Sequence, residues 1–154
     1  MKIIIAGAGE VGFHLSKLLS YESHEIILID QDKDRLLYAD SKLDIKTLQR
    51  DATSIKALKD ANIENSDLFI AVTSSETTNI TACVISKKLG VKKTIARISN
   101  SEFTDKFYTN KSIYKTKIKN CNNEKREIVY AFSFNGRRSF HYWIFLFGLS
   151  FSFF

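Results

Sequence analysis

The chain has 154 residues, enough for one domain but too few for a nucleotide-binding domain together with a full substrate domain. Its two cysteines, Cys83 and Cys121, lack CxxC or Cys/His spacing, so the sequence predicts neither a disulfide framework nor a metal site, and we expect a reducing cytoplasm. The net charge of +6 comes entirely from residues 107–154, which carry 8 basic and 2 acidic side chains, because residues 1–106 carry 15 of each. We therefore divide the chain into an ordinary globular domain over residues 1–106 and an atypical tail over residues 107–154.

Strand-like and helix-like segments alternate along residues 1–106. Short apolar runs predict five strands, at residues 2–6, 25–29, 45–48, 68–72 and 94–98. Helical patterns between them predict four helices, at residues 10–20, 33–42, 54–61 and 76–89. Because each crossover must return the chain to the same sheet, this order predicts an α/β fold, a Rossmann-type parallel sheet with helices on both faces. The apolar run before Gly7 is too short for a signal-peptide core or a membrane span.

The first predicted strand leads into a GxGxxG motif, Gly7-Ala8-Gly9-Glu10-Val11-Gly12. In such a motif the first glycine permits a tight turn, the second lets the backbone approach a pyrophosphate, and the third lets the helix pack on the strand. Free N–H groups at the start of the helix then face the phosphates. The alternative is a strand-to-helix turn that binds nothing. The presence of Asp30 after the next strand favours the nucleotide site.

Asp30 ends the second predicted strand, where a carboxylate can accept hydrogen bonds from both ribose hydroxyls of an adenosine. Gln31 and Asp32 beside it add negative charge in place of an arginine for a 2′-phosphate, so NAD(H) is favoured over NADP(H). Arg35, one helical turn later, weakens that preference. We interpret Asp32 and Asp34 as acids in the first helical turn that complement the helix dipole, rather than as ligand contacts.

Two further loops follow the third and fourth predicted strands, at the sheet edge where ligands bind in such folds: Asp51-Ala52-Thr53 and Thr73-Ser74-Ser75. Thr53, Ser54, Ser74 and Ser75 are equally well explained as helix N-caps, and capping does not exclude ligand contact. Asp51 stands at a strand end opposite Asp30, from which a carboxylate can reach an adenine amino group or a ribose.

Four segments together resemble the N-terminal nucleotide-binding domain of TrkA-type potassium-uptake regulators, the KTN or RCK class: "MKIIIAGAGEVGFHLSKLL", "IILIDQDKDRL", "RDATSIKALKDANIENSDLFIAVTSSETTNI" and "KKTIARISNSEF". The resemblance covers about residues 1–106. It implies a cytoplasmic, membrane-associated regulatory subunit that binds NAD(H), and in some members ATP or ADP. It also implies a homo-oligomer whose nucleotide occupancy gates a membrane potassium transporter.

The resemblance carries the family's binding positions onto this chain. Glycine-loop binding falls on Gly7, Gly9 and Gly12, ribose binding on Asp30, and contact with the adenosine side on Asp51. Thr73 lines the family's pocket, and Asn79 and Arg97 match polar positions near it. The predicted cofactor-binding residues are therefore Gly7, Gly9, Glu10, Val11, Gly12, Asp30, Gln31, Asp51, Ala52, Thr73, Asn79 and Arg97.

One position departs from the family pattern. The family usually has glycine directly before the Asp-Ala-Thr segment, and this chain has Arg50. If the backbone there requires positive φ, a non-glycine residue carries strain.

The competing hypothesis is an NAD-dependent oxidoreductase or epimerase fragment that uses the same cofactor fold. Hydride transfer needs a substrate beside the nicotinamide and usually a general acid or base near it. We expect His14, His24 and His141 to be structural or solvated, and Cys83, on the apolar face of the last predicted helix, to be buried core. No Tyr-xxx-Lys pair or substrate domain follows the fifth predicted strand, so we predict no catalytic residues and favour a sensor over an enzyme.

The tail combines its excess of basic residues with 9 of the 12 phenylalanines. This mixture follows no RNA-binding fingerprint, so we expect no nucleic-acid partner. The apolar end from Phe140 is shorter than a membrane-spanning helix, and it leaves open an interfacial anchor behind Arg137-Arg138 or a shifted reading frame. We expect an irregular tail that is disordered, interfacial or the product of a disrupted or truncated gene.

Overall fold

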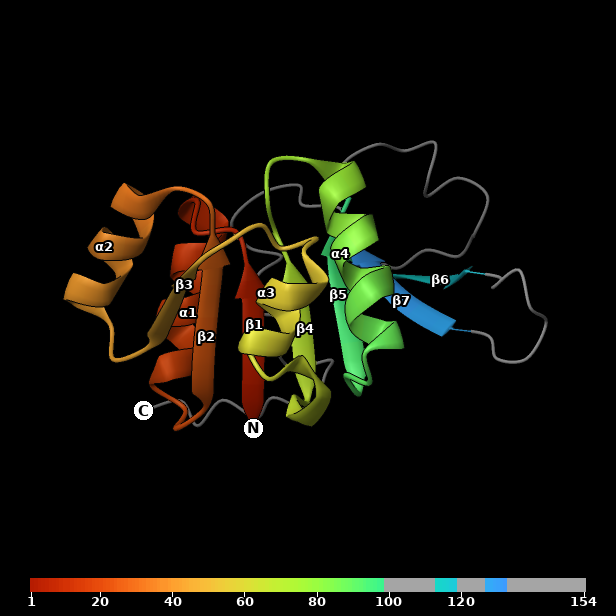
Figure 1. Cartoon of the computed structure of the whole chain (residues 1–154), viewed down its shortest axis with the longest axis horizontal. Coiled ribbons are helices and arrows are strands. Elements are labelled where there is room, and N and C mark those ends of the chain that lie inside the picture. Colours follow the sequence, from red (N-terminus) through yellow and green to blue (C-terminus); the bar gives the residue numbers. More distant parts are fainter. Residues whose placement is uncertain (99–112, 119–126, 133–154) are drawn as a thin grey trace.

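The computed structural model describes residues 1–98 in full and the backbone of residues 113–118 and 127–132 (Figure 1). Strands and helices alternate along residues 1–98: β1 (Lys2–Ala6), α1 (Glu10–Ser20), β2 (Glu25–Asp30), α2 (Lys33–Lys42), β3 (Lys46–Gln49), α3 (Ile55–Asp60), the 3₁₀ helix η1 (Ile63–Asn65), β4 (Leu68–Ala71), α4 (Glu76–Lys88) and β5 (Lys93–Arg97). Two more strands, β6 (Ile113–Ile118) and β7 (Glu127–Phe132), follow in the tail. All five predicted strands and four predicted helices are present, with boundaries that differ by at most one residue.

The strands form one sheet in the order β3-β2-β1-β4-β5-β7-β6. The first five are parallel, and β1 lies between β2 and β4. The chain builds outward from β1 through β2 to β3 and then crosses back to place β4 on the other side of β1. This change of direction between β1 and β4 is where parallel α/β sheets open a ligand crevice, outside the carboxyl ends of the strands.

The continuous apolar sequence of β1 reflects burial of the sheet on both faces. Each of the side chains from Ile3 to Ala6 has no solvent exposure. Ile4 and Ala6 pack into a cluster with residues of α3 and α4, whereas Ile3 and Ile5 pack into a second cluster with residues of α1 and α2. Figure 1 shows α3 and α4 on the face of the sheet toward the viewer. Such two-sided coverage explains why the strands read as apolar runs and not as alternating patterns.

Short polar side chains fix where three of the helices begin. Asp32 caps α2 and accepts from the backbone N–H groups of Asp34 and Arg35, Ser54 caps α3, and Ser75 caps α4. Of the four residues weighed as caps, Ser54 and Ser75 therefore serve that role, since each side-chain oxygen satisfies a free N–H group of the first turn. Asp32 acts as the N-cap, in agreement with a role at the helix terminus.

Cys83 lies in α4 and is fully buried, as expected. Its Sγ donates to the carbonyl oxygen of Ile95 at 3.2 Å, and burial raises the pKa of the thiol far above its ordinary value.

Among the described residues, no helix has the length and apolar character needed to cross a bilayer.

The tail differs in part from the irregular segment that we expected. β7 pairs in parallel with β5, and β6 pairs antiparallel with β7, so the sheet continues beyond its fifth strand. The expectations for His141, Cys121, Arg137-Arg138 and the apolar end from Phe140 fall outside the described residues.

Removing residues 107–154 tests whether β6 and β7 are needed by the rest of the fold. Both apolar clusters and the β4–β5 pairing lie within residues 1–98, so we expect the shortened chain to keep a cooperative thermal transition. Nucleotide affinity should stay within about tenfold, roughly 1.4 kcal/mol, of the full chain. Loss of cooperative melting would instead show that β7 is an essential neighbour of β5.

Candidate functional site

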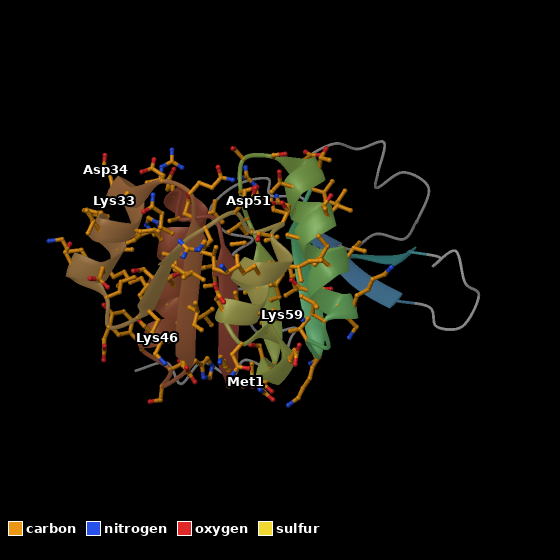
Figure 2. All side chains as sticks on the ribbon, viewed as in Figure 1. Met1, Lys33, Asp34, Lys46, Asp51 and Lys59 are labelled. Carbon is orange, nitrogen blue, oxygen red and sulfur yellow. The ribbon has the colours of Figure 1, made fainter. Side chains whose placement is uncertain are left out.

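A pocket of about 440 Å³ opens at the carboxyl ends of the parallel strands, next to the β1–β4 change of direction. Figure 2 shows Asp51 and the start of α2 at Lys33 and Asp34 along this edge, with Met1 at the opposite edge. Ten of the twelve residues expected from the sequence line the pocket, and Gly12 and Asn79 do not. The structure thus brings together residues at or just after the carboxyl ends of β1, β2, β3, β4 and β5, which are far apart in the sequence.

Gly7 occupies a position that only glycine suits. Its φ is +107°, and a Cβ atom there would stand 2.9 Å from the backbone nitrogen of Thr73. Its own N–H donates to the carbonyl oxygen of Ile29 at 2.8 Å. The turn after β1 is therefore pressed between the end of β2 and the loop after β4, as expected for the first glycine of the motif.

Gly9 and Gly12 lack side chains for different reasons. A Cβ atom on Gly12 would lie 1.7 Å from the carbonyl oxygen of Gly7, so α1 can pack against the turn only with glycine there. A Cβ atom on Gly9 would meet nothing closer than Nη1 of Arg35, at 3.7 Å, and the φ of Gly9 is an ordinary −67°. The fold requires glycine at Gly12 but leaves room for a side chain at Gly9, so the space at Gly9 faces the pocket.

The start of α1 presents unsatisfied donors to the same space. Gly9 is its N-cap residue, and no side chain caps the helix. N–H groups in the first turn of a helix have no partner within the helix, and together with the helix dipole they form a binding site for anions.

Asp30 is held at the end of β2 by two backbone donors. One carboxylate oxygen accepts from the N–H of Ala8 at 2.5 Å, and the other accepts from the N–H of Asp32 at 2.9 Å. Each carboxylate oxygen can accept more than one hydrogen bond, so the side chain keeps acceptor capacity toward the pocket. The same contacts tie the glycine turn to the end of β2.

The loop after β3 contributes Arg50, Asp51 and Ala52 to the pocket. Oδ1 of Asp51 accepts from the N–H and the hydroxyl of Thr53, both at 2.8 Å, which fixes the carboxylate within its own turn. Among the described non-glycine residues, positive φ occurs only at Ser23 and Asn62, so Arg50 replaces the family's glycine without the strain considered above. Its guanidinium donates to the carbonyl oxygen of Gln49 at 2.9 Å and lines the pocket, which the sequence did not indicate.

Asn79 lies behind the pocket wall and is 1% exposed. Its side-chain oxygen accepts from the N–H of Thr73 at 2.9 Å and from the Thr73 hydroxyl at 2.7 Å. Its side-chain nitrogen donates to the carbonyl oxygens of Thr73, at 3.2 Å, and Arg97, at 2.9 Å. An amide has two donors and two acceptor positions, so these four bonds leave Asn79 no capacity for a ligand. Asn79 positions Thr73 and the end of β5.

Charged groups of both signs line the pocket. The cations are Arg35, Arg50 and Arg97, and the acids are Glu10, Asp30 and Asp51. Nε of Arg97 is buried and has no hydrogen-bond partner within the described part of the chain. Seven lining residues are not among the twelve predicted cofactor-binding residues. They are Arg35, Arg50, Ile29, Val72, Ser74, Ser75 and Thr78.

The two described histidines do not line the pocket. Nδ1 of His14 lies 2.8 Å from the carbonyl oxygen of Glu10 within α1 and the ring is exposed. His24 lies beside the N-terminal amine, 3.5 Å away, where burial lowers the pKa of its imidazole. The structural or solvated roles expected of His14 and His24 from the sequence stay a prediction.

Several curated proteins are similar in sequence to this chain. A "Trk system potassium uptake protein TrkA homolog" from Archaeoglobus fulgidus is 40% identical over 106 residues, which are 69% of this chain and 24% of that protein. "Trk system potassium uptake protein TrkA" from Haemophilus influenzae is 40% identical over 117 residues, 73% of this chain and 26% of that protein. The match thus spans about a quarter of the length of these two relatives.

Solved structures at lower identity share the fold. The "GsuK channel bound to NAD" is 17% identical with a TM-score of 0.60, over 68% of this chain and 19% of that one. A UDP-Glc/GlcNAc 4-epimerase from Campylobacter jejuni is 19% identical with a TM-score of 0.52, over 65% of this chain and 37% of that one. The model of the TrkA-N domain family matches residues 3–115, which is most of the chain, and the chain therefore belongs to the TrkA-N domain family.

Proposed function

We propose that this chain is the NAD(H)-binding regulatory domain of a membrane potassium-uptake system, in which nucleotide occupancy controls transport. The observation that carries the proposal is the open space at Gly9, in front of the uncapped start of α1 and beside the carboxylate of Asp30. Packing does not explain the missing side chain at Gly9, whereas the approach of a pyrophosphate does. Family membership and relatives named as potassium uptake proteins support the transport role.

The pocket suggests how the dinucleotide lies. The pyrophosphate sits against Gly7, Gly9 and the first turn of α1, formed by Glu10 and Val11, where free N–H groups favour negative charge. The adenosine ribose binds Asp30. Ten residues contact the ligand in this proposal: Gly7, Gly9, Glu10, Val11, Asp30, Gln31, Asp51, Ala52, Thr73 and Arg97.

Regulation requires that two ligand forms bind two conformations with different affinity, because equal affinities shift no population. We place the responding elements at Thr73 and Arg97, whose backbones are joined through Asn79. The partner in this proposal is a potassium transporter subunit, and the domain acts as a homo-oligomer at the cytoplasmic face of the membrane. ATP or ADP is the second ligand form to test against NAD(H).

The proposal makes the chain a sensor and not an enzyme. The ionisable side chains of the described pocket wall are acids and arginines, and two of the acids are held by hydrogen bonds within the fold. The UDP-sugar epimerase fold match leaves catalysis as the rival hypothesis, which requires a substrate site beside the nicotinamide.

Calorimetric titration of the full chain with NADH, NAD⁺, NADPH and ATP tests the ligand. We expect NADH to bind more tightly than NADPH, because the 2′-phosphate of NADPH would bring a third negative group next to Asp30 and Asp32. Like charges brought together in a binding site cost several kcal/mol. Equal or tighter binding of NADPH would contradict the assignment of Asp30, and absence of all nucleotide binding would contradict the function.

Gly9→Val tests the phosphate approach. The valine side chain fills the space in front of α1, so we expect nucleotide binding to fall below detection while the melting temperature changes little. Ser20→Val, at the other end of α1, is the matched control and should bind as the wild type does. Normal nucleotide binding by Gly9→Val would show that the ligand does not approach this turn.

Cofactor turnover separates the sensor from the enzyme. We expect the absorbance of NADH to stay constant when the full chain is incubated with NADH and carbonyl compounds, because the described pocket wall contains no histidine and two of its three acids are held by hydrogen bonds within the fold. An active dehydrogenase assayed in parallel is the control for the assay. Protein-dependent oxidation of NADH at a saturable rate would favour the oxidoreductase hypothesis.

A further inference from the structure

Arg35 lies in the first turn of α2 and lines the pocket. Its side chain is 58% exposed, yet it is oriented by one neighbour. One carboxylate oxygen of Asp32 accepts from the backbone N–H of Arg35 at 3.2 Å, and the other lies 3.1 Å from Nε of Arg35. Asp32 is thereby both the N-cap of α2 and the partner that holds the Arg35 guanidinium.

The free end of that guanidinium reaches the glycine turn. Nη1 of Arg35 is the nearest atom, at 3.7 Å, to the position that a Cβ of Gly9 would occupy. The uncapped start of α1 borders the same space. An anion at Gly9 therefore has N–H groups of α1 on one side and the terminal nitrogens of Arg35 on the other.

Helix stability does not account for an arginine at this position. A positive side chain in the first turn of a helix opposes the helix dipole. The ion pair with Asp32 is exposed on both partners, and exposed pairs of this kind contribute little to folding. A guanidinium oriented by a carboxylate but with its terminal donors free is instead suited to bind phosphate.

We propose that Arg35 is a phosphate contact of the nucleotide bound at the glycine turn and that Asp32 is its positioning residue. This inference rests on the proposed nucleotide site. It adds a binding residue from α2 to a set of contacts otherwise drawn from strand ends and from the start of α1. On the phosphates bound at the glycine turn, Asp32 acts only through Arg35.

The same arginine has a second possible target on chemical grounds, the 2′-phosphate of NADPH. The two targets predict different ligand dependence. A contact at the glycine turn affects every ligand with a 5′-phosphate, whereas a 2′-phosphate contact affects NADPH alone. The distance from Arg35 to Gly9, the pyrophosphate position of the motif, favours the first.

Titration of the full chain and its Arg35→Ala variant with NADH, NADPH, AMP and adenosine tests the proposal, with adenosine measured by its displacement of NADH. We expect Arg35→Ala to weaken NADH and AMP about tenfold or more, as for the loss of a hydrogen bond to a charged group, and to leave adenosine unchanged. Arg35→Lys should recover part of the loss, since it keeps the charge but not the fork of donors.

Asp32→Asn tests the positioning role. Asparagine caps helices as well as aspartate, so α2 keeps its N-cap while the ion pair with Arg35 is lost. We expect NADH to bind several-fold more weakly, and we expect the same substitution to have no effect when Arg35 is already alanine. Asp34→Asn removes the same charge two residues further along and should bind NADH as the wild type does.

The outcomes separate this inference from the proposed function. Equal weakening of adenosine and NADH by Arg35→Ala would show a structural role, and weakening confined to NADPH would show a 2′-phosphate contact; either result overturns the proposal. Wild-type affinity in Arg35→Ala would overturn the proposal and leave the proposed function standing. If the wild-type chain binds no nucleotide, the proposed function fails and this inference fails with it.

Discussion

The contact between Gly12 and the carbonyl oxygen of Gly7 is the constraint on which the site depends. Because any side chain at Gly12 would overlap that oxygen, the first turn of α1 lies directly against the end of β1. The glycine turn also packs against Thr73 and is hydrogen-bonded to the carboxyl end of β2. Three strand ends and one helix start therefore meet within a small volume, and each can contact the same bound molecule.

The fold was predictable from the sequence because burial determines its pattern. Strands covered on both faces leave apolar runs such as residues 3–6, and short polar side chains such as Ser54 and Ser75 mark where helices begin. The 3₁₀ helix η1 and the strand β7 were missed for another reason. A three-residue helix has no periodicity to detect, and β7 is defined by its pairing with β5 across a long stretch of sequence.

The candidate site was predictable at backbone level and less so at the level of side chains. Motif spacing located Gly7, Gly9 and Asp30 because the chemistry there depends on backbone geometry. Asn79 was expected at the ligand, but its four hydrogen bonds form only once β4, α4 and β5 are assembled. The direction of the Arg50 side chain likewise depends on tertiary packing. The sequence showed that Arg50 replaces the family's glycine, but it did not show that the side chain lines the pocket.

The four hydrogen bonds of Asn79 have a mechanical consequence. They join the loop after β4 to the last residue of β5 through a single planar amide group, which has no spare donor or acceptor to exchange during a small movement. A displacement of Thr73 must then either break bonds in a buried environment, where unpaired polar groups are costly, or carry Arg97 with it. We therefore expect the loop after β4 and the last residue of β5 to move together.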